Sequence, residues 1–100
     1  MPRTYFFKVT VPSLYSVEIL PLNHKRVGLT IINRSLTANQ LFLGFTPNLM
    51  ASGLPYNNTI LLNQNDSVTL LKSEGDDCTK AIFGIGFALG YVDVIETEGD

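Results

Sequence analysis

The sequence predicts an all-β fold, a single antiparallel β-sandwich of jelly-roll-like form with about eight short strands. Three observations support this prediction. Apolar and polar residues alternate in several short segments, and clusters of Pro, Gly, Asn and Ser separate these segments at intervals of roughly ten residues. No long segment shows the helical period of about 3.6 residues. Because such a pattern does not encode strand order, a jelly roll and an immunoglobulin-like topology both stay open.

The first predicted strand is 4–11, in which the odd-numbered apolar residues would share one face before Pro12 ends the strand. Residues 1–3 are expected to be frayed. Three consecutive aromatic residues lie close to the N-terminus, so the segment could instead be an arm that docks on a neighbouring subunit. The second predicted strand, 16–20, is also followed by a proline.

The segment 26–45 is typical of two strands, 26–33 and 41–45, around a polar turn. β-branched and aromatic residues alternate with small or polar ones in both, and the turn between them is rich in Asn and Ser. We therefore expect these two strands to pair with each other. Gly44 lies inside the second strand, where a glycine usually marks a bulge or a close approach of another backbone.

The second half of the chain contains four more predicted strands, at 59–62, 67–72, 81–87 and 91–97. In the third of these, Phe83 and Ile85 would share one face, whereas Gly84 and Gly86 would leave the opposite face flat. A flat strip of backbone lets another sheet or another subunit come close. The acidic tail 97–100 is expected to be frayed.

Composition and charge limit the classes of function. The 100 residues predict one domain, 1–100, and only 16% of them are charged, against about 25% in an average protein. Part of the apolar surface is therefore expected to contact other chains, as in a homo-oligomer. The net charge of −2 argues against a nucleic-acid partner. The longest nearly apolar run, 81–92, is shorter than the roughly 20 residues of a membrane-spanning helix, so we expect no membrane partner.

No arrangement of residues predicts a reaction, a metal site or a cofactor, so we expect a protein that is not an enzyme. His24 is the only histidine, and its polar loop offers no second metal ligand of the His or Cys type. The acidic loop 75–77 lacks the spaced oxygen ligands of a calcium loop. Cys78 is the only cysteine, and the neighbouring carboxylates disfavour its thiolate.

Candidate contact residues are the aromatic residues near the N-terminus, the apolar residues of the loop 46–58 and the glycines of the flat strip. Apolar residues in a loop either cap the end of a sandwich or face a partner. The candidates for a subunit or partner interface are Tyr5, Phe6, Phe7, Leu49, Met50, Tyr56, Gly84 and Gly86.

Over residues 17–96 the chain resembles a group of small virion proteins of tailed bacteriophages. Their pattern is an apolar strand followed by Pro, an Arg, an alternating strand ending in Asn and Ser, a strand closing on Leu-Gly-Phe, a Gly-Leu-Pro step and two final strands. The matching pieces are Ile19-Leu20-Pro21, Arg26, 29–35, 41–45, Gly53-Leu54-Pro55, 81–90 and 91–96. The aromatic start at residues 5–7 departs from this pattern, so the resemblance does not specify a position on the particle.

The resemblance implies a protein without catalytic activity that binds the capsid lattice and reinforces it, as a decoration or cement protein. Such a protein would be made in the host cytoplasm and incorporated into the virion. Its expected partners are further copies of itself, as a homotrimer, and the major capsid protein or another virion protein.

The alternative is a carbohydrate- or receptor-binding β-sandwich of a phage fibre or tail. Tyr15, Tyr56 and Tyr91 would stack on sugars, and the many Asn and Gln side chains would supply hydrogen bonds. Against this alternative, the chain contains no Trp, the aromatic residue best suited to a sugar platform.

Overall fold

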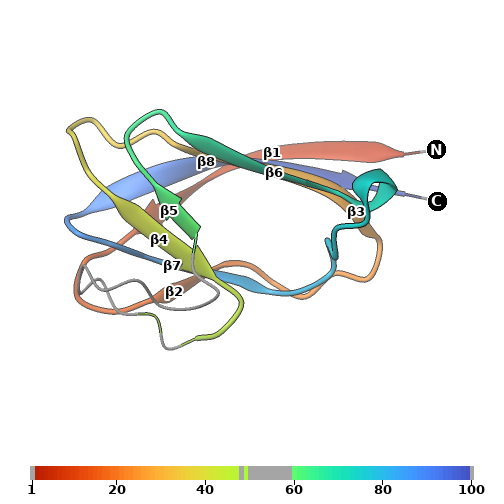
Figure 1. The fold of residues 1–100 in the computed structure, drawn as a ribbon, viewed down its shortest axis with the longest axis horizontal. Helices are drawn as coiled ribbons and strands as arrows, with labels where there is room; N and C mark the ends of the chain where they lie inside the picture. The colour runs from red at the N-terminus through yellow and green to blue at the C-terminus, as the bar shows by residue number, and fades with distance from the viewer. Residues whose placement is uncertain (1, 48, 50–59, 100) are drawn as a thin grey trace.

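A computed structural model describes residues 2–47, 49 and 60–99. In this part of the chain, eight strands form two antiparallel sheets that pack face to face (Figure 1). The first sheet has the order β1 (Arg3–Val11), β8 (Gly90–Glu98), β3 (Arg26–Asn33) and β6 (Ser67–Leu71). The second has the order β2 (Val17–Leu20), β7 (Ile82–Gly86), β4 (Leu41–Gly44) and β5 (Ile60–Leu62). A short 3-10 helix, η1 (Lys72–Glu74), follows β6.

The strand pairs are those of a jelly roll. Strand β1 pairs with β8, β2 with β7, β3 with β6 and β4 with β5, as if one long hairpin had been rolled into a sandwich. The all-β sandwich is thus confirmed, and each predicted strand agrees with an observed one to within one residue at either end. Residues 97 and 98, expected to be frayed, belong to β8 and pair with Thr4 and Arg3.

One predicted pairing is wrong. The segments 26–33 and 41–45 do not pair, because β3 lies between β8 and β6 in the first sheet and β4 lies between β7 and β5 in the second. The polar residues 34–40 therefore cross from one sheet to the other and do not form a hairpin turn. Alternation shows that a strand has an apolar face, but it does not identify the strand beside it.

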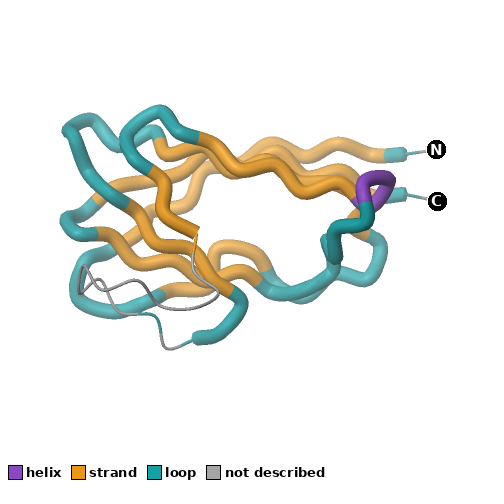
Figure 2. Tube along the Cα trace, in the orientation of Figure 1, coloured by secondary structure: helices purple, strands orange, loops and turns teal. Residues whose placement is uncertain are grey.

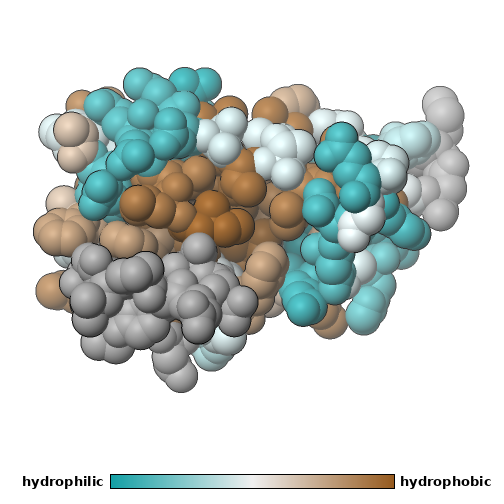
Figure 3. Space-filling model, in the orientation of Figure 1, coloured by the Kyte–Doolittle hydropathy of each residue, from teal (hydrophilic) through white to brown (hydrophobic). Residues whose placement is uncertain are grey.

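The core lies between the sheets and consists of inward-facing residues from the strands of both sheets. It contains Val11, Ile19, Leu20, Leu29, Ile31, Leu41, Leu43, Leu62, Ile82, Val92 and Val94. Burying one such side chain contributes about 1.5–3 kcal/mol. On the side where β5 and β6 form the sheet edges, Ile60, Val68 and Leu70 are only partly buried, and Figure 3 shows an apolar band along this side of the molecule.

The glycines of β7 face this core and are not open to a partner. A Cβ atom on Gly84 would lie 2.5 Å from Cδ1 of Ile19, and one on Gly86 would meet the backbone oxygen of Ala88. The flat strip therefore receives side chains of the same domain, so Gly84 and Gly86 are wrong as interface candidates. The opposite face of β7 is covered as well, because Phe42, Leu49, Ile85 and the partly buried Phe83 form a second apolar cluster.

Leu49 is buried in that cluster, where it covers the outer face of the second sheet, so it is not an exposed contact residue. Met50 and Tyr56 lie outside the described residues. The segment 4–11 is an in-domain strand, because β1 pairs with β8 along its whole length.

The two ends of the sandwich differ (Figures 1 and 2). We call one the loop end: it carries the connections 12–16, 34–40, 63–66 and 87–89. The other, the terminal end, carries both chain termini and the connections 21–25 and 72–81 (Figure 1).

Candidate interaction surfaces

Large apolar side chains gather at the loop end. They come from three different connections and are strongly exposed: Leu14 (90%), Tyr15 (63%), Leu36 (84%), Phe87 (60%) and Leu89 (68%). We call these five residues the loop-end patch. Single exposed apolar residues are common, but several at one end of a small domain are typical of a contact surface.

Buried amide side chains hold the loops that carry this patch. The amide of Asn33 is fully buried; its Nδ2 donates to the carbonyls of Asn39 (2.9 Å) and Leu62 (3.0 Å), and its Oδ1 accepts from the Ser35 amide. The Asn39 side chain in turn holds Ala88: Nδ2 donates to the Ala88 carbonyl at 2.7 Å and Oδ1 accepts from the Ala88 amide at 2.9 Å.

Backbone hydrogen bonds connect the same loops to one another. The Gly86 amide donates to the carbonyl of Pro12 at 2.9 Å, and the Phe87 amide donates to the carbonyl of Gln40 at 2.9 Å. Three connections that are distant in sequence are therefore fixed together. A surface held in this way loses little conformational entropy when it binds a partner.

A hollow of about 440 Å³ lies beside the patch. Its walls come from residues 37–40, 63–64 and 87–88, which belong to three connections of the loop end. Phe87 is part of both the hollow and the patch. The loop end therefore offers protruding apolar side chains next to a recess.

The N-terminal half of β1 is a second exposed region. Residues 2–8 are all exposed, including Tyr5 (39%), Phe6 (74%) and Phe7 (37%). Val11 and Val9 face the core, so Phe6 and Lys8, which have the opposite parity, face outward. The Tyr5 hydroxyl donates to Oε1 of Glu98 at 3.3 Å. The exposure of Tyr5, Phe6 and Phe7 is compatible with their expected interface role, which stays a prediction.

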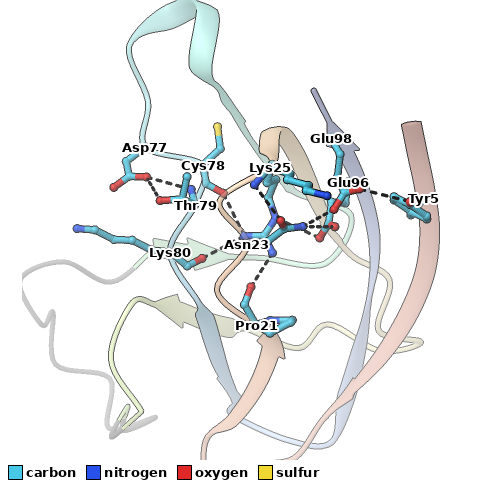
Figure 4. A network of polar contacts seen from close by, with 11 residues as sticks. Tyr5, Pro21, Asn23, Lys25, Asp77, Cys78, Thr79, Lys80, Glu96 and Glu98 are labelled. Carbon is cyan, nitrogen blue, oxygen red and sulfur yellow. Dashed lines mark hydrogen bonds and ion pairs between the residues drawn. The ribbon is translucent and has the colours of Figure 1, made fainter. Parts of the chain in front are cut away.

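A polar network closes the terminal end (Figure 4). Arg26 is only 1% exposed; its Nε donates to Oε2 of Glu96 at 3.1 Å, and its Nη atoms donate to three backbone carbonyls. Asn23 adds hydrogen bonds to Glu96 (3.1 Å) and Glu98 (2.8 Å). The carbonyls belong to Pro21, Cys78 and Lys80, so Arg26 joins two connections to β8. Each of the three guanidinium nitrogens of Arg26 donates at least one hydrogen bond, so the network stabilises this end of the fold.

Two other titratable groups have shifted pKa values. Hydrogen bonds from Thr79 lower the pKa of Asp77 below its ordinary value, with a smaller contribution from Lys80. Burial, and then the nearby Asp76, raise the pKa of the Cys78 thiol, which therefore stays protonated at neutral pH. His24 is exposed. Within the described residues there is no cluster of three or more His, Cys, Asp or Glu that could hold a metal ion.

A further hollow, of about 630 Å³, lies on the outer face of the first sheet above Gly28, between Leu71 and Ile95. Two tyrosines of the sugar-binding alternative lie in the part of the chain that the structure describes. Tyr15 is exposed in the connection 12–16, whereas Nζ of Lys8 lies 4.6 Å from the ring centre of Tyr91 on β8. Tyr56 lies outside the described residues.

Sequence reasoning did not find the loop-end patch. Each of its members is a single apolar residue, or one of two neighbours, within a connection otherwise rich in polar or small residues. The only signal was that apolar residues occur at all in three short connections, and the jelly-roll topology is needed to bring those connections together.

No protein-family model and no curated protein matches the sequence. Two solved structures are similar in fold. One is reported as "Bacillus endospore appendages form a novel family of disulfide-linked pili", with a TM-score of 0.56, 10% identity, and coverage of 98% of this chain and 86% of that chain. The other is the Yersinia pseudotuberculosis-derived mitogen, with a TM-score of 0.47, 10% identity, and coverage of 100% and 89%. At such identity the first similarity establishes the β fold alone. In the described residues, no helix is long and apolar enough to cross a membrane.

Proposed function

We propose that this chain is a non-enzymatic structural subunit of a larger protein assembly, and that it attaches to a repeated protein lattice through the loop-end patch. The observation that carries the proposal is the gathering of five exposed apolar side chains on loops fixed by hydrogen bonds. Each contact can be modest in strength, because repetition over a lattice multiplies the binding.

The assembly that we propose is a virion, in which the chain acts as a decoration or cement protein that reinforces the coat. The support is the resemblance of residues 17–96 to small virion proteins of tailed bacteriophages, together with the jelly-roll pairing of the strands. Jelly rolls are used repeatedly in viral capsid proteins, although lectin domains use them too. The proposed partners are further copies of the chain and the major capsid protein or another virion protein.

The test is co-sedimentation with capsids that lack this chain. We expect the wild-type protein to pellet with the capsids, and the variants Leu36→Ser and Phe87→Ser to stay largely in the supernatant. Leu22→Ser is the matched control, because Leu22 is a similarly exposed apolar residue (57%) at the terminal end. Equal pelleting of all three variants would exclude the loop-end patch as the attachment surface, and a wild-type protein that never pellets would exclude the capsid role.

A second candidate function is that of a pilus-type subunit, favoured by the similarity in fold to the Bacillus endospore appendage protein. The linkage would have to differ from that of the disulfide-linked pili. Cys78 is the only cysteine, it is buried, and one cysteine per chain can join no more than two copies. Electron microscopy of the concentrated, reduced protein tests this candidate: filaments would support it, and particles of uniform small size would count against it.

A further inference from the structure

The edge of β1 offers a second contact, separate from the loop-end patch. Among the strands that the structure describes, β1 is the last of its sheet and has only β8 as a neighbour. In an antiparallel pair, every second residue directs its N–H and C=O groups away from the partner strand, so half of the backbone groups of β1 face outward along this edge. Such a row of unpaired groups is a template for another strand.

The usual protections of a sheet edge are missing from residues 4–7, the centre of this stretch, and charges occur only on either side of it, at Arg3 and Lys8. Residues 4–7 contain no proline and no charge, and the register between β1 and β8 runs without a shift from Arg3 to Val11. Figure 1 shows β1 and β8 extending toward the termini beyond the strands of the second sheet. The exposure of residues 2–8 agrees with this picture.

We propose that residues 3–9 of β1 pair antiparallel with the same residues of a second copy of this chain, across a two-fold axis that passes beside Phe6. The pairing would join two four-stranded sheets into one continuous sheet of eight strands. It does not depend on the proposed attachment through the loop-end patch, which lies at the opposite end of β1.

Symmetry limits the possible registers. A two-fold axis perpendicular to the sheet keeps outward-facing residues opposite outward-facing residues, so the axis must pass beside a residue and not between two residues. Within the exposed aromatic stretch, the centre is Tyr5, Phe6 or Phe7. Each choice places a different set of side chains opposite one another.

Only the register centred on Phe6 matches every aromatic residue with an aromatic residue. It places Phe6 opposite its own copy on the outer face, and Tyr5 opposite the Phe7 of the other copy on the inner face. A centre at Phe7 would place Phe6 opposite Lys8, and a centre at Tyr5 would place Phe7 opposite Arg3. Aromatic pairs directly across two strands stabilise a sheet, and the Phe6 register also keeps like charges apart.

The outer face of the first sheet supports the same register. Phe6 lies opposite Ile95 of β8, and Ile95 lies opposite Thr30 of β3. The Phe6-centred pairing would extend this row across the axis as Ile95, Phe6, Phe6 and Ile95. Phe6, which is 74% exposed in the single chain, would become covered on the side that is now open.

The contact would be small. With roughly 200 Å² for each aromatic side chain, the exposed fractions of Tyr5, Phe6 and Phe7 amount to about 300 Å² per protomer. The two protomers together would bury about 600 Å², which is below the roughly 1,200 Å² of the smallest standard interfaces. We therefore expect a dimer that dissociates on dilution through the micromolar range, and covalent trapping is the sharpest test.

The test uses cysteine variants in a Cys78→Ser background. In the Phe6 register, the two copies of residue 6 lie directly opposite, with Cα atoms about 4.5–5.5 Å apart, which is within the range of a disulfide. Phe6→Cys is therefore expected to form a covalent dimer under mild oxidation. Thr4 lies opposite Lys8, so the two copies of Thr4 are about 13 Å apart. Thr4→Cys alone and Lys8→Cys alone should form no covalent dimer. A mixture of the two should form a covalent heterodimer.

Sedimentation velocity over roughly a hundred-fold range of concentration gives a second readout. The wild-type chain is expected to shift from monomer toward dimer, and Phe6→Lys, which places two positive charges opposite each other, should remain a monomer. Phe87→Lys is the matched control at the loop end and should dimerise like the wild type. A monomer at every concentration, a trimer, or efficient cross-linking of Thr4→Cys alone would each overturn the proposal.

Discussion

Replacing Arg26 should cost more stability than replacing any other charged residue of the described chain. Its side chain has no exposed surface, and four hydrogen bonds connect it to Glu96 and to three backbone carbonyls. The variant Arg26→Met keeps most of the buried volume but removes every one of these donors. It leaves the Glu96 carboxylate, which is itself 8% exposed, without its cation.

The expected loss follows from the cost of an unpaired buried charge. Removing one partner of a buried ion pair typically destabilises a protein by about 3–5 kcal/mol. The whole domain is expected to have about 5–15 kcal/mol of stability, so the variant would lose a large share. With a urea m-value of about 2 kcal/mol/M, the midpoint of unfolding should fall by about 2 M.

Two variants make this measurement specific. Arg34→Met removes an ion pair of similar length, Nε to Oδ2 of Asp93 at 3.3 Å, but both side chains are about half exposed. It should cost about 0–1 kcal/mol. The double variant Arg26→Met/Glu96→Leu removes both buried charges and should recover about 1–3 kcal/mol relative to Arg26→Met.

Two results would contradict a stabilising buried ion pair: a loss of less than about 1 kcal/mol for Arg26→Met, or a double variant no more stable than the single one. The first result would mean that water satisfies the carbonyls and Glu96 without the guanidinium. The second would mean that the loss comes from the carbonyls alone. Equal m-values across the series would confirm that the midpoints can be compared directly.

Gly86→Ala should destabilise the fold by more than Gly84→Ala in thermal unfolding, because the added methyl group meets fixed backbone in the first case and the movable end of a side chain in the second. The variant Thr79→Ala should raise the pKa of Asp77 toward its ordinary value in an NMR titration; because the folded-state pKa is lowered, any stabilisation by Asp77 is present at neutral pH and is lost as the pH falls through that pKa. The thiol of Cys78 should resist alkylation in the folded protein and react after unfolding.

The strands could be predicted from the sequence because alternation is a local property. Each segment records its own buried face, and the turn residues mark its ends, so bounds such as 26–33 agree with the structure. Pairing is not local. The segments 26–33 and 41–45 are adjacent in sequence, but the chain between them crosses from one sheet to the other. The Asn33 side chain stabilises this crossing by donating a hydrogen bond to the carbonyl of Asn39.

The prediction of contact residues failed for β7, a strand in which the residues of both faces are apolar or small. In β7, nothing in the sequence distinguishes the glycine face from the face of Phe83 and Ile85, and Leu49, which covers the latter, is more than thirty residues away. The loop-end patch was missed for a related reason. Leu14, Leu36 and Leu89 are far apart in sequence, and only the folded sandwich brings their connections to the same end of the molecule.

The two proposed contacts have a geometric consequence when they are combined. In an antiparallel pairing at β1, the two copies point in opposite directions, so the dimer carries one loop-end patch at each far end. Such a dimer could connect two binding sites of the lattice. In a trimer with three-fold symmetry, the three loop-end patches would instead lie on the same side of the oligomer. Where two lattice sites face each other across the length of the dimer, both patches engage, and the avidity can exceed the single-site affinity by about 10²–10⁴-fold.

This consequence separates the two surfaces experimentally. Phe6→Lys leaves the loop-end patch intact but should reduce capsid binding, because a monomer engages one site at a time. A covalent Phe6→Cys dimer should bind at least as tightly as the wild type. Leu36→Ser should weaken both the monomeric and the covalent forms. If Phe6→Lys bound capsids as well as the wild type does, the dimer would not be the binding unit, and attachment would proceed through single chains.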